Sequence, residues 1–340
     1  MSAPFPWLSA TWERLSAARR HGRLGHALLL HGRAGFGKRR FATAFGRLML
    51  CEATGNPDVA CGECRACALL AAGSHPDFAL VTPLEEGKAL GIDQVRELGD
   101  YYSLRPHYGT AKVAILEEAD SMNRPAANAL LKLLEEPPLG ALIMLVADRP
   151  SQLLPTIRSR CQQFALDQGD PALILEWLCA QDGALDARRE LENLARAAGS
   201  PLAARALAER GLATAIDGLV AGMGNVAIGK LQPLAAAAQF AALPLTLLVD
   251  QMLRICHELL LLKSGAALPL ASLGREPEAG LLRLADALHS HGVAVFMQKA
   301  LEVKRLKLGS VTLRELDLAE SLWFDWQAHC AVGKRRAAAH

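Results

Sequence analysis

The chain has 340 residues, and 51% of them are apolar, so it can bury hydrophobic cores and should fold into two or three domains rather than stay disordered. Its 37 Lys and Arg nearly balance its 35 Asp and Glu, and a formal charge of +2 excludes a general basic surface for nucleic acid, so any DNA contact must be local. The N-terminus lacks a secretory signal, and the apolar stretch at 243–262 is too polar for a membrane span, which indicates a cytoplasmic protein with a buried helix there.

The first half of the chain alternates short apolar runs with segments of helical spacing. Such alternation predicts a parallel sheet covered by helices on both faces, in an α/β domain over residues 1–166. One helix is marked at both ends, because Pro125 falls in its first turn and Pro137 follows its last residue, Glu136. The predicted strands are 27–31, 78–81, 112–116, 141–147 and 162–166.

A glycine-rich loop of the phosphate-binding type follows the first predicted strand. The segment Gly32-Arg-Ala-Gly35-Phe-Gly37-Lys38-Arg39 matches G-x-x-x-x-G-K, in which glycines turn backbone N–H groups toward a phosphate and the lysine reaches the β and γ phosphates. Arg39 stands where the pattern has Ser or Thr, and a guanidinium has no lone pair for Mg²⁺. Poor hydrolysis is therefore expected, and two interpretations stay open: a bound nucleotide or phosphate, or a structural loop that faces protein carboxylates.

Four cysteines lie between this loop and the second predicted strand. They are Cys51, Cys61, Cys64 and Cys67, and the C-x₂-C-x₂-C spacing of the last three lets thiolates converge on one tetrahedral ion. Cytosolic thiols stay reduced, so a metal is expected rather than disulfides. A closed set of four cysteines indicates structural zinc, and an iron–sulfur cluster is the alternative with the same ligand type.

Two acidic residues follow the third predicted strand, as in a Walker B motif. Glu117 occupies the position where an Asp usually holds the metal, and its extra methylene displaces the carboxylate by more than an octahedral Mg²⁺ shell tolerates easily. Glu118 is placed to orient water. The pair is therefore either a residual catalytic element or an acidic turn that precedes the helix ending at Glu136.

Beyond residue 166, Ala- and Leu-rich segments of helical spacing replace the strand-like runs. We expect an all-helical second half that divides near residue 212 into a small unit, 167–212, and a larger bundle, 213–331, followed by a solvated tail at 332–340. The expected breaks between helices are Gly183, Gly199, Gly211, Gly265 and Gly292.

Two motifs together resemble the bacterial clamp loaders of the AAA+ class. They are the helix motif Asn128-Ala-Leu-Leu-Lys-Leu-Leu-Glu-Glu-Pro-Pro138 and, after an apolar strand, Ser159-Arg160-Cys161. The segments Gly25-His-Ala-Leu-Leu and Ser74-His-Pro-Asp77 and the four cysteines recur in the same order in that family, over residues 1 to about 205. The resemblance implies an AAA+ domain with an inserted zinc module, a small helical lid and a C-terminal helical collar that joins subunits in an open ring.

The resemblance also implies roles for single residues. In this family the Arg of Ser-Arg-Cys enters the ATP site of the adjacent ATPase subunit, which assigns that role in trans to Arg160, because its donors can stabilise charge on the γ-phosphate. A surface ion pair and a contact to a DNA phosphate are the alternatives. Leu202 and Ala147 occupy the places of a nucleotide-sensing Arg and Thr, so the resemblance implies a subunit that has no ATPase activity and for which ATP binding is doubtful.

The implied function is a non-catalytic part of the DNA polymerase III holoenzyme that helps to load the sliding clamp on primed DNA. The implied ring partners are ATPase subunits of the tau/gamma type and a delta subunit, with the clamp and primer-template DNA reached through the complex and no membrane involved. An active ATP-hydrolysing subunit of the same loader is the main alternative, against which Arg39 and Leu202 argue. A P-loop nucleotide kinase is a second alternative, and it would leave the Ser-Arg-Cys motif around Arg160 unexplained.

Overall fold

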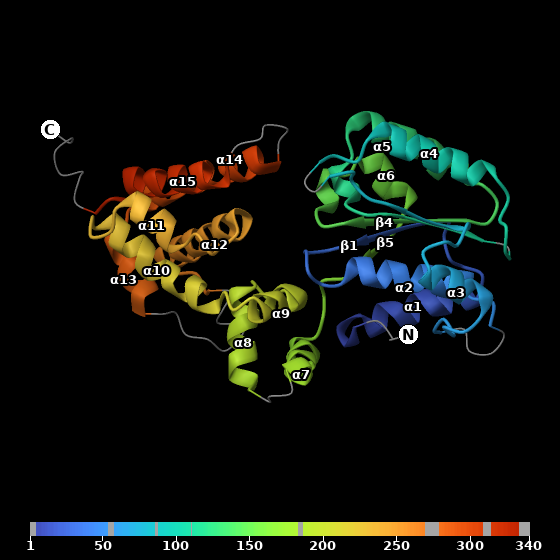
Figure 1. Cartoon of the computed structure of the whole chain (residues 1–340), viewed down its shortest axis with the longest axis horizontal. Helices are drawn as coiled ribbons and strands as arrows, with labels where there is room; N and C mark the ends of the chain where they lie inside the picture. The colour runs from blue at the N-terminus through green and yellow to red at the C-terminus, as the bar shows by residue number, and fades with distance from the viewer. Residues whose placement is uncertain are drawn as a thin grey trace. The chain divides into compact units, whose positions relative to one another are not determined.

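The computed structural model describes residues 5–53, 58–85, 88–109, 111–182, 186–268, 279–308 and 314–332. They belong to two compact units, one of residues 1–187 with 200–202 and one of residues 188–199 with 203–340 (Figure 1). Part of the loop between Cys51 and Cys61, the expected break at Gly183 and the tail from residue 333 lie outside the described residues.

A five-stranded parallel sheet forms the centre of the first unit. Its strand order is β2-β3-β4-β1-β5, and β3 and β4 are buried along their whole length. All five predicted strands are confirmed, and the last one ends a residue earlier than expected. Loops that follow parallel strands meet at one edge of the sheet, so the segments after β1, β3, β4 and β5 lie near one another. The strands are β1 (Ala27–His31), β2 (Phe78–Val81), β3 (Lys112–Leu116), β4 (Ala141–Ala147) and β5 (Gln162–Ala165).

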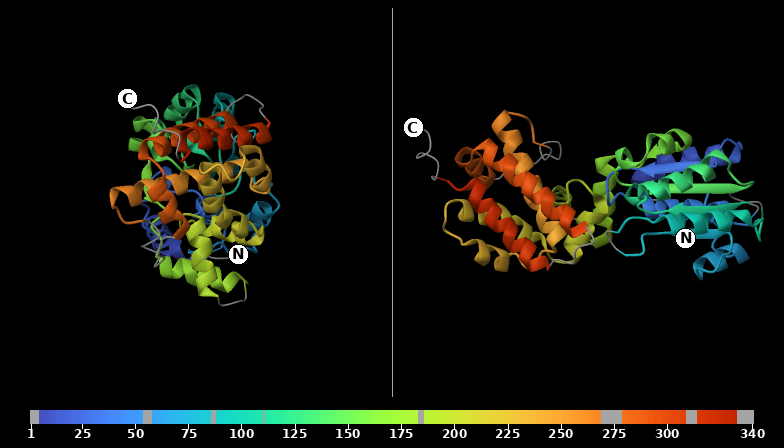
Figure 2. Two further views of the ribbon diagram at one scale, coloured as in Figure 1. Left: turned by 90° about the vertical axis from the view of Figure 1, so that its left-hand side faces the viewer. Right: turned by 90° about the horizontal axis from the view of Figure 1, so that it is seen from above.

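Helices cover both faces of this sheet, which confirms the α/β architecture expected of the AAA+ class (Figures 1 and 2). On one face lie α1 (Ser9–Arg20), α2 (Lys38–Leu50) and α3 (Arg65–Ala71), and on the other lie α4 (Ile92–Ser103), α5 (Arg124–Glu135) and α6 (Pro155–Arg160). Helix α5 begins where expected, because the Asn123 side chain accepts the N–H of Ala126 and Pro125 occupies the first turn. Further elements of this unit are η1 (Pro6–Leu8), η2 (Ala119–Ser121), η3 (Pro150–Gln152) and α7 (Pro171–Asp182).

The regular elements among the described residues of the second unit are all helices, as the sequence predicts. Its core contains two aromatic pairs, Phe240 stacked on Trp323 and Phe296 edge-on to Trp326. Its helices are α8 (Ala187–Arg196), α9 (Pro201–Glu209), α10 (Ala213–Ala227), α11 (Pro233–Gln239), α12 (Leu245–Ser264), α13 (Ala279–Ala287), α14 (Ser290–Leu308) and α15 (Glu315–Cys330).

Glycines end helices at three of the expected positions, because Gly199, Gly211 and Gly265 adopt the left-handed conformation that stops a helix. The expected break at Gly292 is wrong. Gly292 lies in the first turn of α14, where a Cβ atom would come 2.2 Å from the carbonyl oxygen of His329. This glycine therefore serves the close packing of α14 on α15 rather than a turn.

A buried polar network joins α8 to the bundle of the second unit. The Arg196 guanidinium donates to both carboxylate oxygens of Asp217 in α10, at 2.7 Å each, and Gln251 of α12 donates to the Arg196 carbonyl at 2.9 Å. Helix α7 therefore belongs to the first unit, with the sheet, and α8 belongs almost entirely to the second unit, with the bundle. The division into 1–166, 167–212 and 213–331 stays a prediction.

In the part of the chain that the structure describes, no helix has the length and apolar composition needed to cross a membrane.

Candidate metal centre and degenerate nucleotide loop

The glycine loop between β1 and α2 needs its glycines both for backbone conformation and for space. Gly32, Gly35 and Gly37 have φ angles of 134°, 77° and 89°. A Cβ atom on Gly32 would lie 2.8 Å from Cγ of Asp167, and one on Gly37 would lie 2.4 Å from the ring of Phe5. The groups that approach the loop most closely at these two positions are therefore side chains of the chain itself.

Lys38, the candidate phosphate-binding lysine, is turned back onto the protein. Its side chain is 5% exposed, and its Nζ donates to the carbonyl oxygens of Gly32 at 2.6 Å and of Arg33 at 2.7 Å. The same Nζ lies 2.5 Å from Oδ1 of Asp148, which directly follows β4. Asp148 thus gives Lys38 the anionic partner that a phosphate supplies in a working P-loop.

Other groups of the loop are engaged in the same way. The backbone N–H of Arg33 donates to Oδ2 of Asp167 at 3.1 Å, so a loop donor meets a carboxylate from the segment after β5. The Ser200 hydroxyl donates to the Ala34 carbonyl at 3.1 Å, and the Leu202 N–H donates to the Gly35 carbonyl at 3.1 Å. The segment at 200–202 therefore contacts the loop through the Ser200 side chain and the Leu202 backbone.

The two residues at the metal-ligand positions of the motifs pair with each other. Arg39 Nε lies 2.7 Å from Oε1 of Glu117, and Glu117 is 7% exposed. Burial raises the pKa of the Glu117 carboxyl above its ordinary value, the positive charge of Arg39 opposes this rise, and Glu118 adds to it. Arg39, which stands where the motif has a metal-binding hydroxyl, thus partly compensates the negative charge of Glu117.

The acidic segment after β3 also braces the loop after β4. Glu118 has a positive φ of 50°, which is rare for a residue with a side chain, and it precedes the short helix η2. Within η2, Asp120 accepts the backbone N–H groups of Asp148 at 3.3 Å and of Arg149 at 3.0 Å. This arrangement agrees with the acidic-turn interpretation of the segment, and Ala147 ends β4 beside it as a buried residue.

Arg160 lies at the N-terminal ends of the parallel strands, whereas the glycine loop extends from their C-terminal ends. It is the last residue of α6, just before β5 begins, whereas the glycine loop follows the end of β1, which runs parallel to β5. Its NH1 donates to the Thr156 carbonyl at 3.0 Å, and its NH2 lies 2.7 Å from Oε1 of Glu135. The structure therefore does not bring Arg160 to the chain's own loop, and the ion-pair alternative describes its contacts in the isolated chain.

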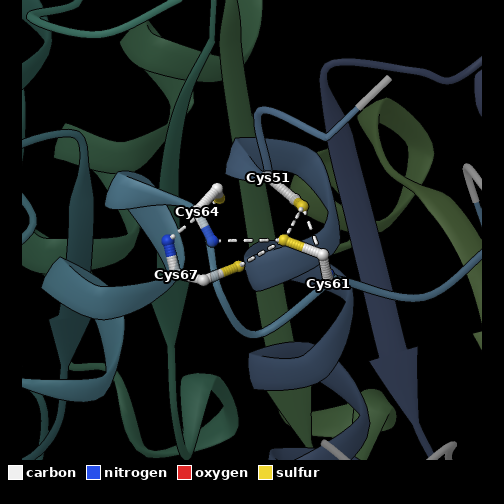
Figure 3. Close-up of side chains that lie close together, drawn as sticks. All are labelled: Cys51, Cys61, Cys64 and Cys67. Carbon is white, nitrogen blue, oxygen red and sulfur yellow. Dashed lines mark hydrogen bonds between the residues drawn. The ribbon is translucent and has the colours of Figure 1, made fainter. Parts of the chain in front are cut away.

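The four cysteines converge, as their spacing predicts (Figure 3). Cys51 directly follows α2, Cys64 precedes α3, Cys67 lies in the first turn of α3, and all four sulfur atoms lie within 4.8 Å of one another. The Sγ atom of Cys61 is 3.6 Å from that of Cys51 and 3.9 Å from that of Cys67. Zinc–sulfur bonds of about 2.3 Å in a tetrahedron place sulfurs about 3.8 Å apart, so the donor set fits a zinc ion.

Backbone N–H groups turn toward these sulfurs. The N–H groups of Cys61, Cys64 and Cys67 donate to the sulfurs of Cys51, Cys61 and Cys64 at 3.3–3.4 Å. Hydrogen bonds from the backbone of Glu63 and of Cys64 lower the pKa of Cys61 to about 6, whereas burial raises the pKa of Cys67 to about 12. Such N–H···S bonds are favourable to thiolates, which are the form that binds a metal.

The cysteine segment is attached to α1 by a small polar cluster. The Trp12 indole N–H donates to the Asp58 carbonyl at 2.8 Å, and the Arg20 side chain pairs with the Asp58 carboxylate. The Trp12 ring packs edge-on against Phe41 and Phe45 of α2. Order in the cysteine segment is therefore coupled to the packing of α1 on α2.

Sequence reasoning did not find three of the residues that make these contacts: Asp148, Asp167 and Glu135. A signal for the first two exists, because each follows a predicted strand of a parallel sheet and so belongs to the edge where ligand-binding loops gather. The signal for Glu135 is an acidic residue in the last turn of a helix, where negative charge is unfavourable without a partner.

Comparison with known proteins gives a consistent result. The family profile described as "DNA polymerase III, delta subunit" matches residues 7–170. A Pseudomonas aeruginosa protein named DNA polymerase III subunit delta' is 40% identical over 252 residues, which cover 74% of this chain and 75% of that protein. The Escherichia coli protein of the same name is 37% identical over 203 residues, or 60% of each chain. A gamma/tau subunit from Mycobacterium bovis is 34% identical over 174 residues, which cover 50% of this chain and 29% of that subunit.

Proposed function

Because the chain belongs to the delta' subunit family of DNA polymerase III, we propose that it works as a clamp-loader subunit without ATPase activity of its own. Its ring partners are ATPase subunits of the gamma/tau type and a delta subunit. The sliding clamp and primer-template DNA are reached through this complex, in the cytoplasm. The active gamma/tau-like alternative is less well supported, since the gamma/tau match is weaker and shorter than the delta' match.

The state of the glycine loop is the observation that carries this proposal. The positive charges of Lys38 and Arg39 are paired with Asp148 and Glu117, and the backbone N–H of Arg33 is paired with Asp167. Nucleotide would have to displace three carboxylates, and magnesium would find a guanidinium in place of a hydroxyl ligand. These contacts support the structural interpretation of the loop and an absence of hydrolysis in cis.

The role proposed for Arg160 is to act on a neighbour's ATP. It lies at the opposite edge of the sheet from the glycine loop and is 37% exposed, so its guanidinium is accessible to an adjoining subunit. Planar donors of this kind stabilise the charge that develops on the γ-phosphate during transfer. The chain then contributes to ATP hydrolysis while its own loop has a structural function.

Zinc, held by the four convergent cysteines, is proposed to have a structural role. A set of four sulfur ligands leaves no open position for water or substrate, which is typical of structural zinc and unlike catalytic zinc. The ion would join the end of α2 to the start of α3 and, through Asp58, support the position of α1.

The proposal is tested with the purified chain and its partners. The isolated chain should hydrolyse ATP at the background rate, whereas the complex of this chain with the gamma/tau-type and delta subunits of its own organism should load the clamp on primed DNA. Omitting this chain should abolish loading. Magnesium-dependent turnover by the chain alone at about 1 s⁻¹ or more, an ordinary enzyme rate, or full loading in its absence, would contradict the proposed function.

A further inference from the structure

Two acidic residues occupy the C-terminal end of α5, where negative charge opposes the helix dipole. Glu135 is the last residue of the helix and Glu136 caps it. A nearby positive charge offsets this unfavourable interaction. For Glu135 the partner is Arg160, whose NH2 lies 2.7 Å from the Glu135 Oε1 atom.

The guanidinium of Arg160 is held at two points. Its NH1 donates to the Thr156 carbonyl one turn earlier in α6, at 3.0 Å, while its NH2 contacts Glu135 across the interface between α5 and α6. Two contacts on different nitrogens fix both the position of the planar group and its rotation about the side chain. The group nevertheless remains 37% exposed, so it is ordered without being covered.

The residues beside this pair are fixed by the core of the first unit. Leu134 precedes Glu135 and is 2% exposed, and Ile157 of α6 is fully buried in the same hydrophobic cluster. The backbone of both partners is therefore set by packing. An arginine side chain has several flexible torsions, and restraining them before binding reduces the entropy lost when its donors meet a phosphate.

We propose that Glu135 is a positioning residue: it orients the Arg160 guanidinium so that the fork of donors is already in place for a neighbour's nucleotide. This inference rests on the proposed role of Arg160 in trans. Without Glu135 the guanidinium samples more rotamers, and a smaller fraction of complexes has the arginine in place during the chemical step. The turnover number of the complex should fall, whereas ATP binding by the neighbour and assembly of the ring should stay the same.

The size of the effect follows from the exposure of the pair. Both side chains are more than a third exposed, and pairs of this kind have interaction energies that correspond to factors of about two to five in an equilibrium. We therefore expect kcat of the clamp- and DNA-stimulated ATPase to fall by about two- to fivefold in Glu135→Gln, with KM for ATP unchanged. Glutamine preserves the size of the side chain and removes only the charge.

The experiment uses the complete reconstituted complex with four forms of this chain: Glu135→Gln, Glu136→Gln, Arg160→Ala and the double variant Glu135→Gln/Arg160→Ala. Glu136→Gln is the matched control, because it removes the same charge one residue further along the chain. It should behave as wild type. In the background of Arg160→Ala, the change at Glu135 should have no further effect, since its action depends on the arginine.

The outcomes separate the two claims. If Arg160→Ala slows the complex and Glu135→Gln does not, the positioning inference is wrong and the trans role stands. A faster complex with Glu135→Gln would also overturn the inference, because it would mean that the acid withholds the arginine. An equal loss from Glu135→Gln with and without Arg160 would show an effect independent of the arginine. Wild-type activity of Arg160→Ala would instead contradict the proposed role of Arg160 in trans.

Discussion

At the scale of single residues, the pair Arg39–Glu117 is the clearest departure from a working P-loop. The carboxylate at this position of a Walker B motif normally faces a metal ion, and here Glu117 faces a guanidinium at 2.7 Å. Burial raises the pKa of Glu117, which means that the folded protein binds the carboxyl proton more tightly than the unfolded chain does. Folding therefore favours the neutral form of the Glu117 carboxyl over the charged form.

This pKa shift predicts a pH dependence of stability. A folded-state pKa above the ordinary value of 4.5 makes the contribution of Glu117 to the free energy of unfolding fall as pH rises through that value toward the raised pKa. Relative to Glu117→Gln, the wild-type chain should therefore lose stability as the pH rises above the ordinary value of 4.5. Arg39→Ala should enlarge the loss, because it removes the charge that opposes the shift. Urea unfolding at a series of pH values measures both, and a difference that does not vary with pH would contradict the account.

Part of this site is predictable from the sequence and part is not. The missing hydroxyl at Arg39 and the longer acid at Glu117 are visible in the motifs, because each motif is a short continuous segment. The contacts of Asp148 and Asp167 with the loop are not visible in these motifs. They depend on the strand order β4-β1-β5, which places the segments after β4 and β5 on either side of the loop after β1. Strand order depends on packing of the whole domain.

At the scale of elements, the cysteine segment connects three helices. Its ligand candidates lie at the end of α2 and at the start of α3, and Asp58 connects the segment to α1 through Trp12. A short segment with few apolar residues has little hydrophobic core of its own. A bound metal would supply the folding energy that this segment lacks.

Metal analysis of the reduced, folded chain should therefore find one zinc ion per molecule. Cys64→Ser should lose the metal, become sensitive to protease near residues 51–67 and change the fluorescence of Trp12, while the second unit stays folded. Glu63→Gln, which leaves all four thiols in place, serves as the control and should retain zinc. A well-folded preparation without zinc would refute the structural role, and iron in its place would favour the cluster alternative.

The joint between α8 and the bundle depends on Arg196. Hydrogen bonds and charge from Asp217 raise the pKa of Arg196, and the side chain is 9% exposed. Arg196→Ala should lower the free energy of unfolding of the second unit by about 2 kcal/mol, because it leaves Asp217 and Asn193 without their donor. Arg188→Ala on the same helix should cost less than about 0.5 kcal/mol, since its ion pair is exposed. Thermal unfolding compares the two, and equal effects would mean that the network does not hold α8.

Elements bounded by clear local signals were predictable. Strands β1 to β4 are largely apolar runs, and α5 has a cap and prolines at its two ends. Packing decides the remainder. The position of Gly292 inside α14 follows from its contact with α15, and the attachment of α8 to the bundle follows from Arg196 and Asp217, which are distant in sequence. Neither can be inferred from a window of neighbouring residues.

At the scale of the whole molecule, the glycine loop lies at the C-terminal ends of the parallel strands and the partly exposed Arg160 lies at their N-terminal ends. These two features cannot act on the same nucleotide within one chain, because the parallel strands β1 and β5 separate them. We propose that they act together in an assembly, in which Arg160 would meet the nucleotide of the next subunit. Membership of the delta' family agrees with such an assembly.

The most direct test compares Arg160→Ala with Arg158→Ala in the reconstituted complex, by measuring ring assembly and the clamp- and DNA-stimulated ATPase. Arginine fingers contribute about 10³–10⁵ in rate elsewhere, but the several ATP sites of a ring dilute the loss of one, so Arg160→Ala should assemble normally and lose activity several-fold. Arg160→Lys should not restore it, since an ammonium lacks the planar fork. Arg158→Ala should retain wild-type activity. Wild-type activity of Arg160→Ala, or failure of that variant to assemble, would contradict the central claim.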